Sequence, residues 1–399
     1  MKPAARRPAT LALEDGSVFG GFAFGAARDT FGEVVFNTSL SGYQEILTDP
    51  SYKGQMVAMT VSHVGNYGIN PEDGESAGIH VDGFIVREAC ADPSNWRSRE
   101  SLHAYLARHG VTGIEGVDTR ALVILLRTKG ALRGVIGTGK TSPTALVKRA
   151  KASPRIEDRD LVQEVSCGKP YEWTEPFADP VAPDPWTPPG HDALHAVVVD
   201  CGVKRNILRS LVSRGCRVTV VPAFTPAAGI LALQPDGVVF SNGPGDPDRL
   251  PQMVQVVRDC IGKVPVFGIC LGHQLVGKAL GGRIFKLRFG HHGGNHPVRH
   301  ERTGKVAITA QNHNFAVDPK NLVPEAEVTH LNLNDRTVEG LRHRTLPVFS
   351  VQYHPEAAPG PHDSRSLFKD FVTMMQGLRR SRSSGFRRNS DGLPQREAP

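Results

Sequence analysis

The sequence predicts an α/β protein whose C-terminal half is a mostly parallel sheet flanked by helices. From His195 onward, short apolar runs alternate with stretches of helical periodicity, as in parallel strands joined by crossover helices. The runs show no polar alternation, which is typical of strands buried on both faces. A proline-rich stretch separates this half from a region of mixed strand and helix patterns. We therefore expect a mixed α/β N-terminal domain at 1–167, a linker at 168–193 and the parallel-sheet domain at 194–378.

The N-terminal domain is expected to hold an antiparallel or mixed sheet and a few helices. Short apolar runs separated by glycine turns indicate the strands. Residues 101–109 and 118–128 are the clearest helices. Asp118 can cap the second helix, because a carboxylate accepts hydrogen bonds from backbone N–H groups of the first turn.

The linker holds seven prolines and two of the three tryptophans of the chain. Proline favours extended backbone, so this segment is predicted to be an extended connection. Its tryptophans are expected to pin it to a surface.

In the C-terminal domain, strands and helices are expected in alternation. The predicted elements are strands at 196–200, 217–221 and 237–240, and helices at 205–214 and 252–261. Open α/β sheets bind ligands at the carboxyl ends of their strands. The active site is therefore expected in the loops that follow these strands.

Composition excludes several classes of function. The chain of 399 residues carries a net charge of +7, and the tail at 379–399 contributes +4 of it through six arginines and two acids. The tail has no apolar periodicity and is predicted to be disordered, while the remaining charge is too scattered to indicate nucleic-acid binding. No apolar run is long enough for a membrane span, and no secretory signal is recognisable. Six cysteines without a paired motif favour reduced thiols in the cytoplasm.

The most informative motif places a cysteine between a strand and a helix. Pro265 to Ile269 reads as a strand and Leu271 begins a helix, with Cys270 at the turn. Gly268 and Gly272 flank the cysteine as in a nucleophile elbow, with sulfur in place of a serine hydroxyl. The positive end of the helix dipole favours the thiolate, which is the reactive form.

A candidate base lies downstream in Tyr353-His354-Pro355-Glu356. His354 and Glu356 can leave the chain on the same side. The imidazole can then take the thiol proton while the carboxylate fixes its orientation. Neither residue alone would be specific, but together with the elbow they indicate a Cys-His-Glu triad.

A third motif, Ser241-Asn242-Gly243-Pro244-Gly245-Asp246-Pro247, follows the strand at 237–240. With the elbow and the His-Pro-Glu stretch, it resembles the triad (class I) glutamine amidotransferases. The resemblance implies that the N–H groups of Gly243 and Leu271 form an oxyanion hole. Such donors stabilise the charge of a tetrahedral intermediate.

Further motifs make the resemblance more specific. The stretches at 31–39, 42–52, 113–120, 289–297 and 311–317 are similar to the small, glutaminase subunits of carbamoyl phosphate synthetase, over about 11–377. This implies hydrolysis of L-glutamine and transfer of ammonia to a large synthetase subunit, which binds ATP and divalent metal and makes carbamoyl phosphate for arginine and pyrimidine biosynthesis. No cofactor is expected on this chain, and it has no P-loop motif.

Two alternatives remain open. The glutaminase of another amidotransferase is disfavoured by the N-terminal domain, and a catalytically silent regulatory subunit is disfavoured by the intact triad.

The resemblance also implies which residues contact the glutamine: Ser51, Gly245, Gln274, Asn312, Asn314 and Phe315. Asn312 and Phe315 are expected in a polar loop before a strand. Asn314 occupies a position where many relatives carry glycine, and asparagine tolerates positive φ better than most residues. His291, His292 and His296 are expected in a glycine-rich turn, and no metal site is predicted there because no matching cysteine or carboxylate accompanies them.

Overall fold

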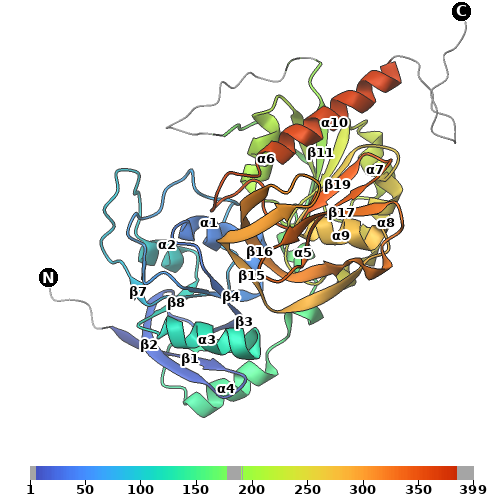
Figure 1. The fold of residues 1–399 in the computed structure, drawn as a ribbon. Helices are drawn as coiled ribbons and strands as arrows, with labels where there is room; N and C mark the ends of the chain where they lie inside the picture. Colours follow the sequence, from blue (N-terminus) through green and yellow to red (C-terminus); the bar gives the residue numbers. More distant parts are fainter. Residues whose placement is uncertain (1–5, 178–189, 191, 384–399) are drawn as a thin grey trace, which may run out of the picture.

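The computed structural model describes residues 6–177, 190 and 192–383. The N-terminal and C-terminal regions form two adjoining lobes (Figure 1). The helix predicted at 101–109 is α2 (Leu102–Arg108), and the one predicted at 118–128 is α3 (Thr119–Lys129), whose first turn is capped by Asp118. Both predictions are confirmed.

The N-terminal lobe is built on a closed barrel, which the sequence did not predict. The strands follow the order β1-β2-β8-β6-β4-β3-β9 and pair in both directions. Gly83 and Gly134 leave room for a methionine in the interior, because a Cβ on either would lie 3.0 Å from the side chain of Met56. The barrel strands are β1 (Arg7–Leu13), β2 (Val18–Gly25), β3 (Thr30–Asn37), β4 (Gln55–Met59), β6 (Gly83–Ile85), β8 (Thr112–Glu115) and β9 (Leu132–Gly137).

Helices and short strands surround this barrel. Ser142 caps α4 and Asp160 caps α5 through their side chains. The further elements of this lobe are α1 (Tyr43–Thr48), α4 (Pro143–Ala152), α5 (Leu161–Val165) and the short pair β5 (His63–Val64) and β7 (Glu88–Ala89).

The C-terminal lobe contains one large sheet in the order β10-β12-β11-β13-β14-β19-β18-β16-β15-β17. Strands β12 to β19 in this order are parallel, which confirms the predicted fold class, and antiparallel strands extend the sheet beyond β19. The bounds are β10 (Tyr171–Trp173), β11 (His195–Asp200), β12 (Arg217–Pro222), β13 (Gly237–Phe240), β14 (Val266–Ile269), β15 (Arg283–His300), β16 (Val306–Asp318), β17 (Ala326–Asn332), β18 (Val338–His343) and β19 (Val348–Val351).

Helices cover both faces of the parallel strands, so these strands are buried throughout. One apolar cluster joins the sheet to α7, α8 and α9, and another joins it to α6 and α10. The helices are α6 (Arg205–Val212), α7 (Ala227–Ala232), α8 (Pro251–Cys260), α9 (Leu271–Ala279) and α10 (Ser366–Ser383). Parallel strands that are covered on both faces expose neither face to water, which explains their continuous apolar sequences.

The predicted linker and tail are both partly ordered. Residues 171–173 form β10, which pairs antiparallel with β12 and packs Trp173 against the core. Trp186 lies outside the described residues. Arg379 to Ser383 continue α10, so the prediction of disorder is wrong for this part of the tail. Arg379 bonds to the carbonyl oxygen of Asp192, and this anchors the helix end. The rest of the tail, 384–399, also lies outside the described residues.

Two predictions about loops are wrong. Asn312 and Phe315 lie within β16, and His291 to His296 lie within β15. The two strands pair in antiparallel register on both sides of irregularities at 286–291 and 293–296. Polar and glycine-rich sequence usually indicates turns, but here the strand partner satisfies the backbone and the polar side chains are buried.

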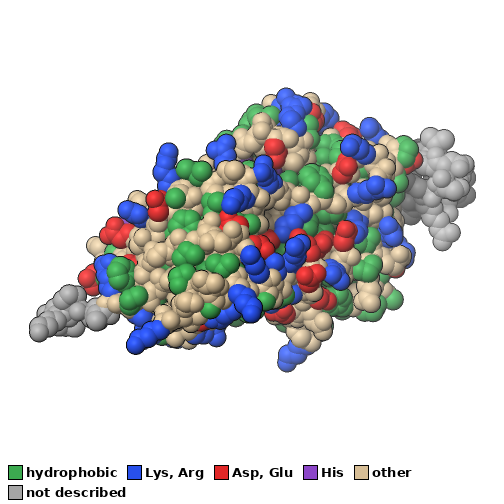
Figure 2. Space-filling model, turned by 90° about the horizontal axis from the view of Figure 1, so that it is seen from below, with side chains coloured by type: hydrophobic (Ala, Val, Ile, Leu, Met, Phe, Trp, Pro, Cys, Tyr) green, Lys and Arg blue, Asp and Glu red, His purple; other side chains and the backbone are tan. Residues whose placement is uncertain are grey.

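Charged side chains of both signs are interspersed on the face seen in Figure 2. Among the described residues, no helix is long and apolar enough to cross a membrane.

The aromatic core of the C-terminal lobe provides a test of the fold. Phe267 is fully buried and stacks on Phe349 with ring centroids 4.4 Å apart. Phe267→Ala should lower the free energy of unfolding by about 3–5 kcal/mol, because it leaves a cavity between the sheet and its helices. Phe224→Ala, at a side chain that is 38% exposed, should cost less than about 1 kcal/mol. Denaturant titration measures both, and equal losses would contradict the assigned core.

Candidate active site

Cys270 lies at a sharp turn between β14 and α9. Its backbone has φ 54° and ψ −105°, a conformation that residues with side chains rarely adopt. The turn requires its glycines: a Cβ on Gly268 would lie 2.6 Å from the carbonyl oxygen of Gly272, and one on Gly272 would lie 2.0 Å from that of Phe240. The side chain is 2% exposed, and its Sγ lies 3.6 Å from the carbonyl oxygen of Asn312.

His354 and Glu356 follow β19, the parallel neighbour of β14. The backbone N–H of Cys270 donates to the carbonyl oxygen of Val351, so the end of β19 lies beside the cysteine. Nδ1 of His354 lies 2.6 Å from Oε1 of Glu356. If Nδ1 donates to this carboxylate, Nε2 stays free to exchange a proton with the thiol. Nε2 is buried and makes no hydrogen bond of good geometry with any described residue.

Lys204 adds a buried positive charge that the sequence analysis missed. Its Nζ lies 2.9 Å from Oε1 of Glu356, and the side chains of Lys204 and Glu356 are 3% and 0% exposed. Lys204 closes the loop that follows β11. Since loops at the carboxyl ends of parallel strands carry ligand sites, its position was the signal that could have found it.

The pKa values of this group reflect its burial and mutual charges. Burial opposes a charge on His354, but the carboxylate of Glu356 and the thiol of Cys270 raise its pKa to about 10. Burial also opposes the charge of Glu356, yet Lys204 and His354 lower its pKa to about 2. Lys204 likewise has a raised pKa despite burial, because carboxylates surround it. The site therefore holds a charged His-Glu-Lys cluster at neutral pH.

The loop after β13 is fixed closely against this turn. The backbone N–H of Gly272 donates to the carbonyl oxygen of Ser241 at 3.1 Å. A Cβ on Gly243 would lie 2.1 Å from the carbonyl oxygen of Cys201, so only glycine fits. This contact brings the loop that carries Gly243 beside the helix start at Leu271.

A small cavity of about 20 Å³ opens beside Cys270. Its volume suffices for about one water molecule, so a glutamine side chain requires the lining to move. The predicted glutamine residues Ser51, Gly243, Gly245, Gln274, Asn312, Asn314 and Phe315 all line it, and Leu271 is buried next to Cys270 in the chain.

Both lobes contribute to the walls of this cavity. Ser51 comes from the N-terminal lobe, and its Oγ accepts a hydrogen bond from Nδ2 of Asn242 at 2.8 Å. Asp49, also from that lobe, accepts from Nδ2 of Asn312 at 2.9 Å and from the backbone N–H of Ser51. The sequence analysis assigned no role to the side chains of Asp49 and Asn242, because their partners lie far away along the chain.

Asn314 uses its side chain to join the lobes. Its φ is not positive, so the tolerance of asparagine for left-handed backbone is not required. Its Nδ2 donates to Glu33 of the barrel at 3.3 Å, and its Oδ1 lies 3.0 Å from Nε2 of His292.

None of the predicted histidines His291, His292 and His296 of β15 is among the residues that line the cavity beside Cys270. His292 contacts the side chains of Asn312 and Asn314. Nε2 of His291 lies 2.8 Å from Asp335, and Glu339 is also near, so the pKa of His291 rises to about 9 despite burial. With His313, the residues His291 and Glu339 have the side-chain types of a metal site. The tertiary structure thus places the carboxylates of Asp335 and Glu339 beside His291, although neither is close to it in the sequence.

Comparisons with known proteins match both lobes. Residues 197–374 match the family model of class-I glutamine amidotransferases, and residues 11–136 match that of the carbamoyl-phosphate synthase small chain. The carbamoyl phosphate synthase small chains of Syntrophotalea carbinolica and Aquifex aeolicus are each 54% identical, over 94% and 93% of this chain and 99% and 100% of theirs. The chloroplastic small chain of Oryza sativa is 51% identical over 93% of this chain and 83% of its own.

The matches cover the barrel lobe as well as the sheet that carries Cys270 and His354. The chain therefore belongs to the family of carbamoyl phosphate synthase small chains.

Proposed function

We propose that this protein hydrolyses L-glutamine to glutamate and ammonia through a cysteine thioester and passes the ammonia to a large synthetase subunit. The observation that supports this most directly is the strained, buried Cys270 beside the His354–Glu356 pair, with a cavity on the open side of the thiol. A thiol with an adjacent oriented base is the arrangement required for nucleophilic acyl transfer.

In the first half of the reaction, Sγ of Cys270 attacks the side-chain carbonyl carbon of glutamine. The negative oxygen that forms is placed to accept hydrogen bonds from the N–H groups of Gly243 and Leu271. His354 then donates its Nε2 proton to the amide nitrogen, the carbon–nitrogen bond breaks, and ammonia leaves. The product is a γ-glutamyl thioester on Cys270.

In the second half, neutral His354 takes a proton from water, and the hydroxide attacks the thioester carbonyl. The carbon–sulfur bond breaks, and glutamate is released with the thiolate restored. Throughout both halves, Glu356 accepts a hydrogen bond from the Nδ1–H group of His354 and stabilises the imidazolium. Lys204 keeps Glu356 ionised in this role.

The ammonia is consumed on the large subunit, where we place bicarbonate, ATP and its divalent metal. The carbamoyl phosphate formed there enters arginine and pyrimidine biosynthesis in the cytoplasm. A second small cavity shares Asn312 with the first and is also lined by Lys204, Gly293, His354 and Pro359, and it offers a first step for ammonia on its way out.

Cys270→Ser should abolish glutamine-dependent carbamoyl phosphate synthesis by the assembled enzyme and leave synthesis from added ammonia intact. The large subunit does not need the thiol for its own chemistry. Cys260→Ser is a matched control, because Cys260 is equally buried but lies in α8. Substantial glutamine hydrolysis by the Cys270 variant would show that Cys270 is not the nucleophile and that the reaction does not proceed through a thioester on it.

Glu356→Gln should lower kcat by about 10²–10⁴-fold, by analogy with loss of the orienting acid in other triads. The carboxylate raises the pKa of His354 to about 10, so the imidazolium is present through neutral pH and is lost as pH rises through that value. Without the carboxylate this loss occurs at lower pH.

Alkylation of Cys270 by iodoacetamide, followed by mass spectrometry between pH 5 and 9, measures how the reactivity of the thiol changes as His354 loses its proton. At pH 7 the variant should react more slowly, because the thiolate has lost its imidazolium partner. An unchanged profile would mean that Glu356 does not control His354.

The isolated chain should hydrolyse glutamine more slowly than the assembled enzyme. The cavity is too small for the substrate and has walls from both lobes, so a docked partner that adjusts the lobes can open it. Displacement of reacting groups by about 1 Å costs roughly a hundredfold in rate. Equal kcat at saturating glutamine, with and without the large subunit, would show that the free chain is already organised.

A further inference from the structure

The loop between β5 and β6 of the N-terminal lobe contacts the C-terminal lobe and carries a buried carboxylate, Glu75. The side chain of Glu75 in this loop is almost fully buried, and its backbone N–H donates to Oγ1 of Thr48 at 2.9 Å. Its carbonyl oxygen accepts from the backbone N–H of Arg205 at 2.9 Å, and its Oε2 accepts from that of Asn206 at 3.1 Å. Glu75 thus caps the first turn of α6, in the other lobe.

Helix α6 lacks a capping side chain of its own. Its N-cap residue is Lys204, whose side chain makes no cap hydrogen bond and instead reaches Glu356. The exposed N–H groups of a helix start require acceptors, and a carboxylate there also interacts favourably with the helix dipole. Glu75 meets both requirements, so the position of Lys204 depends on a residue of the N-terminal lobe.

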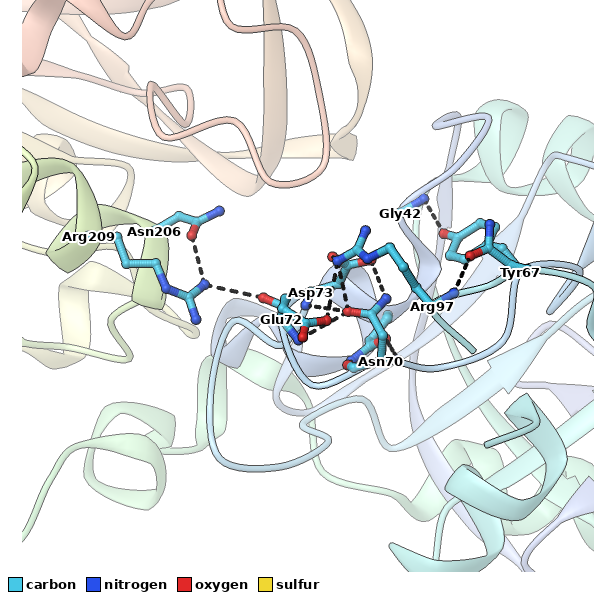
Figure 3. Close-up of polar contacts among 10 residues, drawn as sticks. Gly42, Tyr67, Asn70, Glu72, Asp73, Arg97, Asn206 and Arg209 are labelled. Carbon is cyan, nitrogen blue, oxygen red and sulfur yellow. Dashed lines mark hydrogen bonds and ion pairs between the residues drawn. The ribbon is translucent and has the colours of Figure 1, made fainter. Parts of the chain in front are cut away.

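The loop that carries Glu75 is braced on both sides (Figure 3). Nη2 of Arg97 lies 2.7 Å from Oδ1 of Asp73, and Nδ2 of Asn70 lies 2.6 Å from Oδ2 of the same carboxylate. Arg209 of α6 reaches from the opposite side to the carbonyl oxygen of Glu72. The loop is therefore held by its own lobe through Asp73 and by α6 through Glu72.

We propose that Glu75 is a positioning residue for the catalytic triad, a carboxylate of the N-terminal lobe that caps α6 and thereby holds Lys204 against Glu356. This inference rests on the proposed glutaminase function. It assigns to the barrel lobe a role in catalysis beyond the wall of the glutamine cavity: the placement of the two lobes sets the position of a charge next to the triad.

The charged groups around Glu75 determine how its contact with α6 depends on pH. Glu356, Glu75 and Asp49 surround Lys204, while Glu75 in turn is near Lys204, Glu356 and Arg209. Glu75 also interacts with Glu45 of α1, whose pKa is raised to about 8 by burial and neighbouring carboxylates. Burial raises the pKa of Glu75 to about 7, with Lys204 offsetting part of the effect. Its negative charge is therefore present above about pH 7 and is lost as the pH falls below that value.

Glu75→Gln reproduces the protonated carboxyl group, so it provides the central test. In the assembled enzyme at saturating glutamine, wild type and variant should have similar kcat at pH 6. Above pH 7 the kcat of the variant should fall behind by roughly tenfold, with KM changed less than about twofold. Glu75→Ala, which also removes the cap acceptor, should lose at least as much kcat at every pH. Glu72→Gln is a matched control on the same loop, since α6 contacts its backbone oxygen and its carboxylate pairs with Arg97 of the same lobe.

Alkylation of Cys270 by iodoacetamide, at the same pH values and corrected for the folded fraction from circular dichroism, gives a second readout that does not need glutamine. We expect the wild-type and Gln variant rates to agree at pH 6 and to separate above pH 7. A ratio of kcat and of alkylation rates that stays at one, or that is the same at every pH, would overturn the proposal. If wild type fails to hydrolyse glutamine, the proposed function fails, while the alkylation rates still decide the role of Glu75.

Discussion

The buried positive charge of Lys204 is the constraint on which the arrangement of the site depends. An ammonium group removed from water is costly unless carboxylates surround it. Glu356 provides the direct ion pair at 2.9 Å. Because the same carboxylate oxygen also meets Nδ1 of His354 at 2.6 Å, the charge that satisfies Lys204 also fixes the imidazole.

The parallel sheet brings these groups together from distant parts of the chain. Lys204 follows β11, Asn242 and Gly243 follow β13, Cys270 follows β14, and His354 follows β19. These strands are neighbours in the sheet and run in one direction, so all their carboxyl ends meet at one edge. The close turns there require glycine where one backbone approaches another, as Gly272 does at the carbonyl oxygen of Phe240.

The junction between the lobes is polar because it is part of the site. Ser51 and Asp49 bond to Asn242 and Asn312, and Lys286 of β15 forms an ion pair with Glu33 of the barrel at 2.6 Å. Buried hydrogen bonds are directional and costly to leave unmade, so they hold the lobes in register where apolar packing alone would permit sliding. The same directionality makes the small cavity beside Cys270 sensitive to how the lobes are placed.

By itself the sequence determined the elements that depend on interactions between residues close together in the chain. The apolar runs gave the parallel strands, Asp118 gave the start of α3, and the spacing Gly268-Cys270-Gly272 indicated the elbow, because each rests on periodicity, capping or backbone sterics within a few residues. The residues expected to contact glutamine were inferred from resemblance, and the structure places them around one cavity.

Only the tertiary structure decided the rest. Closure of the barrel depends on pairing between strands remote in sequence, and the polar stretches of β15 and β16 are strands because each satisfies the backbone of the other. The ion pair of Lys204 with Glu356 and the cap that Glu75 places on α6 join residues that are far apart in the chain. The strength of an ion pair or hydrogen bond depends on the distance between its groups in space. That distance is set by the fold and cannot be read from the order of residues in the chain.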